Sequence, residues 1–263
     1  MRARIVRVRS GLAPIVLAVV LLGTWELYVD LAGVESDLLP APHAVASALW
    51  SNGWLVWRNF TVTAEQVVLG LALALACGLA LAVAIHLSPL LRRAIYPLAV
   101  GSQAVPIPVI GVLLVFWWGF GLFPKLVVIA LICFFPVVVT TVDGLASVDP
   151  EQPKLLRTLD ASRWQTFRFA ELPAALPAAL SGARIALAVG VIGAFIAETS
   201  TPSTEAYSGL GHEIITDAGG FQTARAYAAT AVLFVFAITC FYALALAERR
   251  LAPWSSQSRG DTR

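Results

Sequence analysis

The chain has 263 residues, of which 59% are hydrophobic and 13% are charged, and its mean hydropathy is +0.80. A soluble domain of this length needs a more charged exterior, whereas a lipid-facing protein does not. The formal net charge of +2 is too small to indicate a nucleic-acid partner, and almost all of the positive side chains are arginines. We therefore expect an all-α integral membrane protein.

Six segments are long and apolar enough to cross a bilayer, which takes roughly 20 residues. The predicted spans are 12–33, 62–86, 94–118, 124–146, 174–198 and 226–248. The first is expected to be a retained helix, because it lacks a small-residue cleavage site. The third is broken near its middle by Pro106 and Pro108. In the second, Gly70, Ala74 and Gly78 recur every four residues, either as a surface for close approach of a neighbouring helix or as ordinary small-residue richness.

Arginine and lysine placement predicts the orientation, because these residues concentrate in cytoplasmic loops. With a cytoplasmic N-terminus and six alternating spans, the inside segments hold Arg2, Arg4, Arg7, Arg9, Arg92, Arg93, Lys154, Arg157, Arg163, Arg168, Arg249, Arg250, Arg259 and Arg263. The outside segments hold Arg58, Lys125 and Arg225. This asymmetry predicts a cytoplasmic tail at 1–11, a transmembrane domain at 12–250 and a second cytoplasmic tail at 251–263.

Neither a metal nor a disulfide is indicated. Cys77, Cys133 and Cys240 are odd in number, lie in apolar runs and have no CxxC spacing. The three histidines share no ligand spacing either. We expect no cofactor and no catalytic site. Turns are expected in 199–223, where glycines cluster.

The longest inside segment, 147–173, is polar and basic and has helical periodicity. Leu155, Leu156, Leu159 and Trp164 are predicted to share one face of a short amphipathic helix. Asp149 and Pro150 lie just before it, where a helix can start. Such a helix either lies on the lipid surface or docks into a partner protein, and the periodicity favours neither.

Residues 154–177, KLLRTLDASRWQTFRFAELPAALP, resemble the cytoplasmic coupling loop of ABC importer permeases. The family pattern is EAA, three residues, Gly and a later Ile/Val-x-Leu-Pro, which Glu171-Leu172-Pro173 matches in part. Further resemblances extend over roughly 20–255, with order and spacing kept. They are Trp25-Glu26-Leu27, Leu39-Pro40-Ala41-Pro42, Phe134-Phe135-Pro136, Asp143-Gly144-Leu145, Ala197-Glu198, Gly209-Leu210-Gly211 and Glu248-Arg249-Arg250-Leu251-Ala252-Pro253-Trp254. The subgroup resembled handles sulfonates, taurine, nitrate and thiamine precursors, and the loop is most similar to hydroxymethylpyrimidine permeases.

The resemblance implies a multi-pass protein of the bacterial inner (plasma) membrane with a cytoplasmic coupling helix. Its implied partners are a second permease copy, ABC ATPase subunits, an extracytoplasmic substrate-binding protein and membrane lipid. The implied ATPase-coupling residues are Lys154, Arg157, Leu159, Asp160, Ala161 and Ser162. The loop departs from the pattern, because Lys154, Leu155, Leu156 and Asp160 replace the family's Glu, Ala, Ala and Gly. Neither lysine of the chain lies in a GxxxxGK[ST] loop, so ATP hydrolysis requires another chain.

The candidate substrate-path residues are Gln103, Pro106, Pro108 and Glu198. Irregular backbone at membrane depth is tolerated where it lines a cavity, although the prolines fit a structural kink as well. Ionisable groups in spans are costly and often functional. Glu198 is either a path residue or a solvated helix end. Arg184 is about 21 Å from it along a helix at 1.5 Å per residue, so the two do not pair directly.

Two other classes of protein compete with a permease of an ABC importer. An ion-coupled secondary transporter would carry mid-membrane carboxylate pairs and internal repeats, and neither is evident. An intramembrane enzyme would need a convergent His/Asp/Glu or Ser/Lys set in the spans, which is also absent from the sequence. For an ABC importer the substrate expected is a hydroxymethylpyrimidine-type thiamine precursor, and the alternatives are aliphatic sulfonate, taurine or nitrate.

Overall fold

The computed structural model describes residues 2–101, 104–201 and 204–252, and these residues form helices without any strand. In chain order the helices are α1 (Arg2–Ala32), α2 (Pro42–Ser51), α3 (Gly53–Leu87), α4 (Pro89–Gly101), α5 (Ile107–Trp118), α6 (Leu122–Ala146), α7 (Glu151–Thr158), α8 (Arg163–Thr166), the π-helical turn η2 (Phe167–Glu171), α9 (Leu172–Ser200), the 3₁₀ turn η3 (Glu205–Tyr207), α10 (Leu210–Gly219) and α11 (Thr223–Leu251).

Four helical segments of the described chain are long and apolar enough to cross a bilayer. They are Gly53–Leu87, Leu122–Ala146, Arg163–Ser200 and Thr223–Leu251. The all-α membrane fold is thereby confirmed. The predicted span 12–33 lies inside α1 except for its last residue, because α1 runs from Arg2 to Ala32. The predicted span 94–118 is divided between α4 and α5, because α4 ends at Gly101 and α5 begins at Ile107.

Helices α3, α6 and α9 form the tightly packed centre. A Cβ atom on Gly70 would lie 2.6 Å from Ile129 Cγ2, and one on Gly78 would lie 2.8 Å from Val137 Cγ1. Ala74, between them, is buried. The stripe of small residues on α3 is therefore the surface on which α6 approaches. Small residues allow this because two backbones come close only where side chains are absent.

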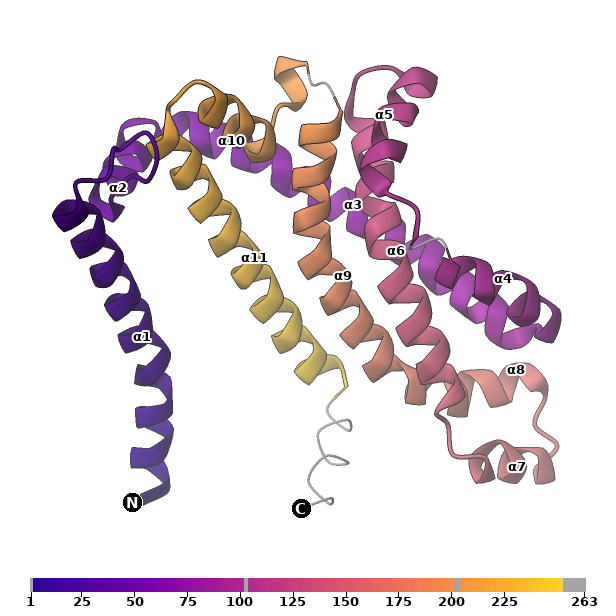
Figure 1. Cartoon of the computed structure of the whole chain (residues 1–263). Helices are drawn as coiled ribbons and strands as arrows, with labels where there is room; N and C mark the ends of the chain where they lie inside the picture. The colour runs from indigo at the N-terminus through magenta and orange to yellow at the C-terminus, as the bar shows by residue number, and fades with distance from the viewer. Residues whose placement is uncertain (1, 102–103, 202–203, 253–263) are drawn as a thin grey trace.

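The two ends of the bundle differ (Figure 1). Helix α1 begins and α11 ends near the end that carries α7, whereas α2, α10 and η3 lie at the opposite end. We call these the coupling end and the distal end. Helix α1 stands apart from the central helices and meets the others at the distal end. There Glu26 accepts a hydrogen bond from the His43 backbone N–H, and Trp25 lies 5.9 Å from Tyr227 between ring centroids.

Candidate coupling and pathway sites

Helix α7 begins where the sequence predicts a start. The Asp149 Oδ1 atom accepts a 2.9 Å hydrogen bond from the Glu151 backbone N–H, and Pro150 is the N-cap residue. This carboxylate satisfies one of the N–H groups that a first turn leaves without a helical partner. The helix then extends only to Thr158.

The predicted single amphipathic helix is divided after Thr158, which corrects the expectation that Leu155 and Trp164 share one helical face. The Ala161 N–H donates to Leu156 O at 3.0 Å, and the Asp160 N–H donates to Arg157 O at 3.1 Å. These two bonds form a Schellman turn, whose central residue adopts a left-handed conformation. Asp160 has that conformation, with φ of +56°. Asp160 occupies the position of the family's Gly. A left-handed conformation at this position explains the family's glycine, which adopts it without strain.

A second helix starts immediately after the turn. Ser162 Oγ accepts from the Gln165 N–H at 3.2 Å, while Gln165 Oε1 accepts from the Ser162 N–H at 2.7 Å. This reciprocal pair is a capping box, and it starts α8 at Arg163. Helix α8 continues through η2 into α9, so the segment leads directly into a membrane span.

The predicted coupling residues lie on α7 and in the turn between α7 and α8. Lys154, Arg157, Leu159, Asp160 and Ser162 are exposed, and Ala161 is half-buried. Lys154 pairs with Glu151 at 2.7 Å on the same helix. Large apolar side chains are exposed beside the basic groups, with Leu155 64%, Leu159 71%, Trp164 61% and Phe169 66% exposed. Exposed apolar side chains of this size beside basic groups are typical of an interaction surface rather than of a surface that only contacts water.

The coupling segment is anchored to α3 by a carboxylate whose partner the sequence did not indicate. Glu171 Oε2 lies 2.8 Å from His86 Nε2, and Glu171 Oε1 lies 3.8 Å from an Arg163 nitrogen. Phe167 is buried with Leu145 and Ala175 on the same side of the segment. These contacts join α8 and η2 to α3 and α6. His86 is 85 residues away in sequence, so no local pattern predicts the pair.

At the distal end, Glu198 is buried by other parts of the chain, with only 1% of its surface exposed. Its Oε1 atom accepts a 2.8 Å hydrogen bond from the Thr63 hydroxyl, and its Oε2 atom accepts a 2.6 Å bond from the Gly211 N–H. A Cβ on Gly209 would lie 2.0 Å from Glu198 Oε1. The expectation of a solvated helix end is therefore wrong, and the Gly209-Leu210-Gly211 motif is explained by the closeness of this carboxylate.

Further buried or partly buried polar contacts lie at the distal end. Lys125 is fully buried, and its Nζ atom donates to the Tyr207 carbonyl at 2.6 Å. Asn59 Nδ2 donates to Glu213 Oε2 at 2.6 Å. Burial raises the pKa of the Glu213 carboxyl, although the hydrogen bond from Asn59 opposes that rise. Arg225, at the start of α11, forms a two-pronged contact with the Asp217 carboxylate.

The other candidate path residues lie at the break between α4 and α5. Pro106 is the N-cap residue of α5, and Pro108 follows in its first turn. Both are exposed in the single chain. Gln103 lies outside the described residues. Within the spans, Arg184 is held by Glu248 of α11 at 3.2 Å, as expected for a residue that does not reach Glu198.

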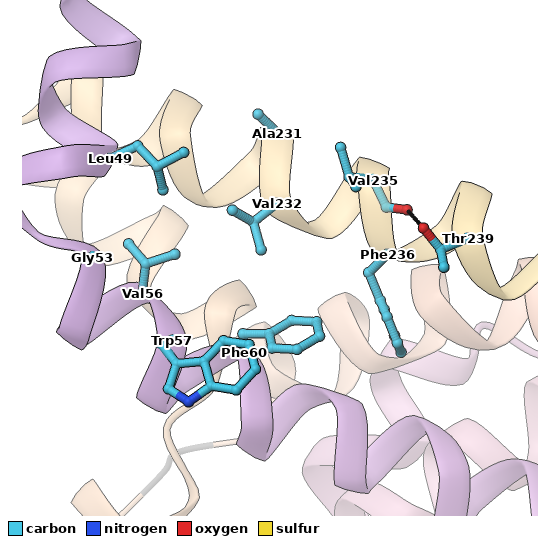
Figure 2. A pocket seen from close by; sticks show the side chains of 10 residues that line it. All are labelled: Leu49, Gly53, Val56, Trp57, Phe60, Ala231, Val232, Val235, Phe236 and Thr239. Carbon is cyan, nitrogen blue, oxygen red and sulfur yellow. Dashed lines mark hydrogen bonds between the residues drawn. The ribbon is translucent and has the colours of Figure 1, made fainter.

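An apolar cavity of about 480 Å³ lies between α11 and the start of α3. Figure 2 shows Trp57, Phe60 and Phe236 on its walls, with the Thr239 hydroxyl turned to the Val235 carbonyl of its own helix at 2.8 Å. None of the lining residues is charged, so the cavity has the character of a lipid-facing surface.

Comparisons with known proteins agree with this architecture. The model of the family described as "Binding-protein-dependent transport system inner membrane component" matches residues 66–254. A probable ABC transporter permease of Haemophilus influenzae is 33% identical over 89% of this chain and 94% of its own length. The riboflavin transport permease RibX of Chloroflexus aurantiacus is 33% identical over 90% of this chain and 87% of its own length. The formylaminopyrimidine transport permease ThiX of Halalkalibacterium halodurans is 30% identical over 93% of this chain and 96% of its own length.

A solved structure shows the same fold. The inward-facing MetNI methionine ABC transporter includes a chain that superposes with a TM-score of 0.66 at 17% identity, covering 76% of this chain and 98% of that one. The family match spans well over half of the 263 residues. This chain belongs to the binding-protein-dependent transport inner membrane components, and it is the non-catalytic permease subunit of an ABC importer, in which a separate ATPase hydrolyses ATP.

Proposed function

We propose that this permease imports a small neutral or weakly charged nitrogen heterocycle, of the class of thiamine pyrimidine precursors. The observation that carries the proposal is the pairing of span cations within the chain. Arg184 faces Glu248, and Lys125 donates to the Tyr207 carbonyl. A sulfonate, taurine or nitrate path would favour cationic groups turned towards the solute, since ionisable groups in membranes mark solute pathways. The relatives named for riboflavin and formylaminopyrimidine both handle nitrogen heterocycles.

Competition for uptake tests this substrate class. The permease, its ATPase and its binding protein are placed in liposomes, and uptake of a labelled hydroxymethylpyrimidine is measured with excess taurine, sulfonate or nitrate outside. We expect ATP-driven pyrimidine uptake that none of the three competitors reduces. Uptake of labelled taurine with no pyrimidine uptake would overturn the substrate proposal while leaving the permease assignment intact.

The proposed arrangement places the coupling end in the cytoplasm of a bacterium, with both termini on that side. The arginine asymmetry supports this, as does the common location of the start of α1, the end of α11 and α7 in Figure 1. The distal end then faces the binding protein, and a second permease copy completes the pathway. Leu159→Cys should react with an impermeant thiol reagent only in inverted vesicles, and Phe221→Cys, exposed at the distal end, only in right-side-out vesicles.

The surface from Lys154 to Ser162 is the proposed docking site for the ATPase. Its exposed leucines offer apolar contact, and Arg157 offers a charge for orientation. Charge reversal at Arg157, or a bulky side chain at the half-buried Ala161, should uncouple ATP hydrolysis from uptake while membrane insertion persists. Lipid-surface binding of this segment instead of protein docking would leave both variants with normal transport.

The solute path is proposed to pass the α4–α5 break and to include Gln103, Pro106 and Pro108. Pro106 is the N-cap residue of α5 and Pro108 lies in its first turn, both exposed in the single chain. Glu198 takes part in the path at the distal end. An interruption between two helices provides backbone groups without helical partners, which a solute or a second subunit can satisfy. Pro108→Ala, which restores an N–H, should change uptake more than Pro97→Ala within α4 does.

A further inference from the structure

The segment between η3 and α10 is held to three membrane helices by polar contacts. The Tyr207 carbonyl accepts from Lys125 of α6 at 2.6 Å and from Gln66 of α3 at 3.4 Å. The Leu210 N–H donates to Thr63 Oγ1 at 2.9 Å, and the Gly211 N–H donates to Glu198 Oε2 at 2.6 Å. Residues 207–211, here called the distal strap, therefore join α3, α6 and α9 at one point.

Glu198 and Thr63 also complete the first turn of α10. Gly209 is the N-cap residue of this helix and has no side chain to bond the next N–H groups. The Thr63 hydroxyl and the Glu198 carboxylate supply those acceptors from other helices. A carboxylate at a helix N-terminus is favoured by the helix dipole as well as by the hydrogen bond. Helix α10 thus starts only as long as α3 and α9 stay beside it.

Apolar packing at the strap is confined to Leu210. Its side chain is fully buried and packs with Val56 and Ala229, whereas Tyr207 is 37% exposed. The main apolar core lies along α3, α6 and α9. Opening the strap therefore breaks a few directed hydrogen bonds and withdraws Leu210 from its small cluster.

We propose that the Glu198 carboxylate and the Thr63 hydroxyl form a latch that closes the distal strap over the end of the pathway, and that this latch opens when the pathway opens to the outside. Glu198 is then a positioning residue rather than a ligand of the solute. Breaking its two bonds removes the polar links from α9 to α10 and from α9 to α3 at the distal end, where an opening requires these elements to move. The inference rests on the proposed function, an ATP-driven import of solute past the distal end.

The closeness of the Glu198 carboxylate explains why glycines stand at positions 209 and 211. A Cβ on Gly211 would lie 2.8 Å from Glu198 Oε2, and one on Gly209 would meet both the carboxylate and Thr63 Oγ1, at 2.0 and 2.3 Å. A side chain at either position would keep the latch from closing, although the φ angle of Gly209, −102°, is one that any residue can adopt. The glycines are therefore required for close approach and not for backbone conformation.

Hydrogen exchange in the whole transporter tests the latch. Amide exchange of peptides covering 207–217 is compared in the wild type, Glu198→Gln, Thr63→Val and the control Thr199→Ala. The Thr199 hydroxyl bonds only the Phe195 and Ile196 carbonyls of its own helix, among its hydrogen bonds in the described structure. Weakening or loss of these buried hydrogen bonds should speed exchange in Glu198→Gln and Thr63→Val by about tenfold or more. The control should exchange as the wild type does.

A second arm asks whether the latch moves during transport. Trapping the ATPase with ATP and vanadate should speed exchange at 207–217 in the wild type and add little in Glu198→Gln. Unchanged exchange in both latch variants would overturn the latch, and unchanged exchange on trapping would overturn its opening. Both results are read in a wild-type complex already shown to take up solute with ATP. A complex that takes up no solute with ATP would instead contradict the proposed function.

Discussion

Glu171 Oε2 lies 2.8 Å from His86 Nε2, and this pair joins η2 to the last turn of α3. Both side chains are largely buried, with 14% of His86 and 7% of Glu171 exposed. His86 lies two residues before the point where α3 gives way to α4. We expect a force applied to α8 to reach α3 and α4 through this pair.

Replacing His86 by Ala should lower the number of solute molecules moved per ATP hydrolysed. The variant leaves the Glu171 carboxylate buried beside an alanine, at a cost of about 1–3 kcal/mol to the local structure. Coupling is measured as the ratio of uptake to phosphate release in liposomes. Glu151→Gln, which breaks the exposed Lys154 pair on α7, is the control and should retain the ratio. An unchanged ratio in His86→Ala would remove this pair from the transmission route.

Asp160→Gly should stabilise the turn between α7 and α8. Asp160 has φ of +56°, a conformation that costs an L-residue about 1–2 kcal/mol and costs glycine little. Asp160→Val should loosen the same turn, because a β-branched side chain tolerates this conformation poorly. Exchange of the Asp160 and Ala161 amides reports the turn directly. We expect slower exchange in the glycine variant and faster exchange in the valine variant, and the reverse order would contradict the turn geometry.

Gly70→Ala should destabilise the central packing of α3 against α6. The added methyl would lie 2.6 Å from Ile129 Cγ2, so the helices must separate, at a cost of about 1–3 kcal/mol. Gly23→Ala is the matched control, because nothing lies within 4 Å of the added atom. Unfolding temperatures in detergent provide the comparison. Adding Ile129→Ala should partly restore Gly70→Ala, and equal stability of the two glycine variants would argue against this helix contact.

Glu213 should make α10 less stable as the pH rises. Its pKa is raised above 4.5, mainly by burial, so the folded state holds the proton more tightly than the unfolded state. Stability contributed by the protonated form is present at low pH and is lost as the pH rises from the unfolded value through the raised one. Glu213→Gln should therefore flatten the pH dependence of amide exchange in α10 as the pH rises above 4.5. A dependence as steep as in the wild type would assign it to another group.

The sequence predicts the spans well because lipid imposes long apolar runs. It fails where polar helices are short. Glycines at 209 and 219–220 indicate turns, yet they bound α10, with Gly209 as its N-cap and Gly220 as its C-cap. Helix α3 begins at Gly53 rather than near 62, since its first turns carry interfacial aromatics that lower the hydropathy without breaking the helix.

The sequence likewise predicts some features of the polar sites and misses others. The position of the coupling segment follows from its charge and periodicity, and the start of α7 follows from Asp149. The division at Asp160 depends on one left-handed residue, which hydrophobic periodicity does not detect. The partners of Glu198 and Glu171 lie 135 and 85 residues away, so only the packed helices bring them together.

The central claim is that a separate ATPase drives this permease through the surface from Lys154 to Ser162. ATP-dependent uptake in liposomes that contain the permease, its ATPase and its binding protein tests it most directly, with the wild type and Arg157→Glu compared. The account predicts uptake that requires ATP and all components, and ATP hydrolysis without uptake in the variant. Uptake by the purified permease alone, driven by an ion gradient without ATP, would contradict it.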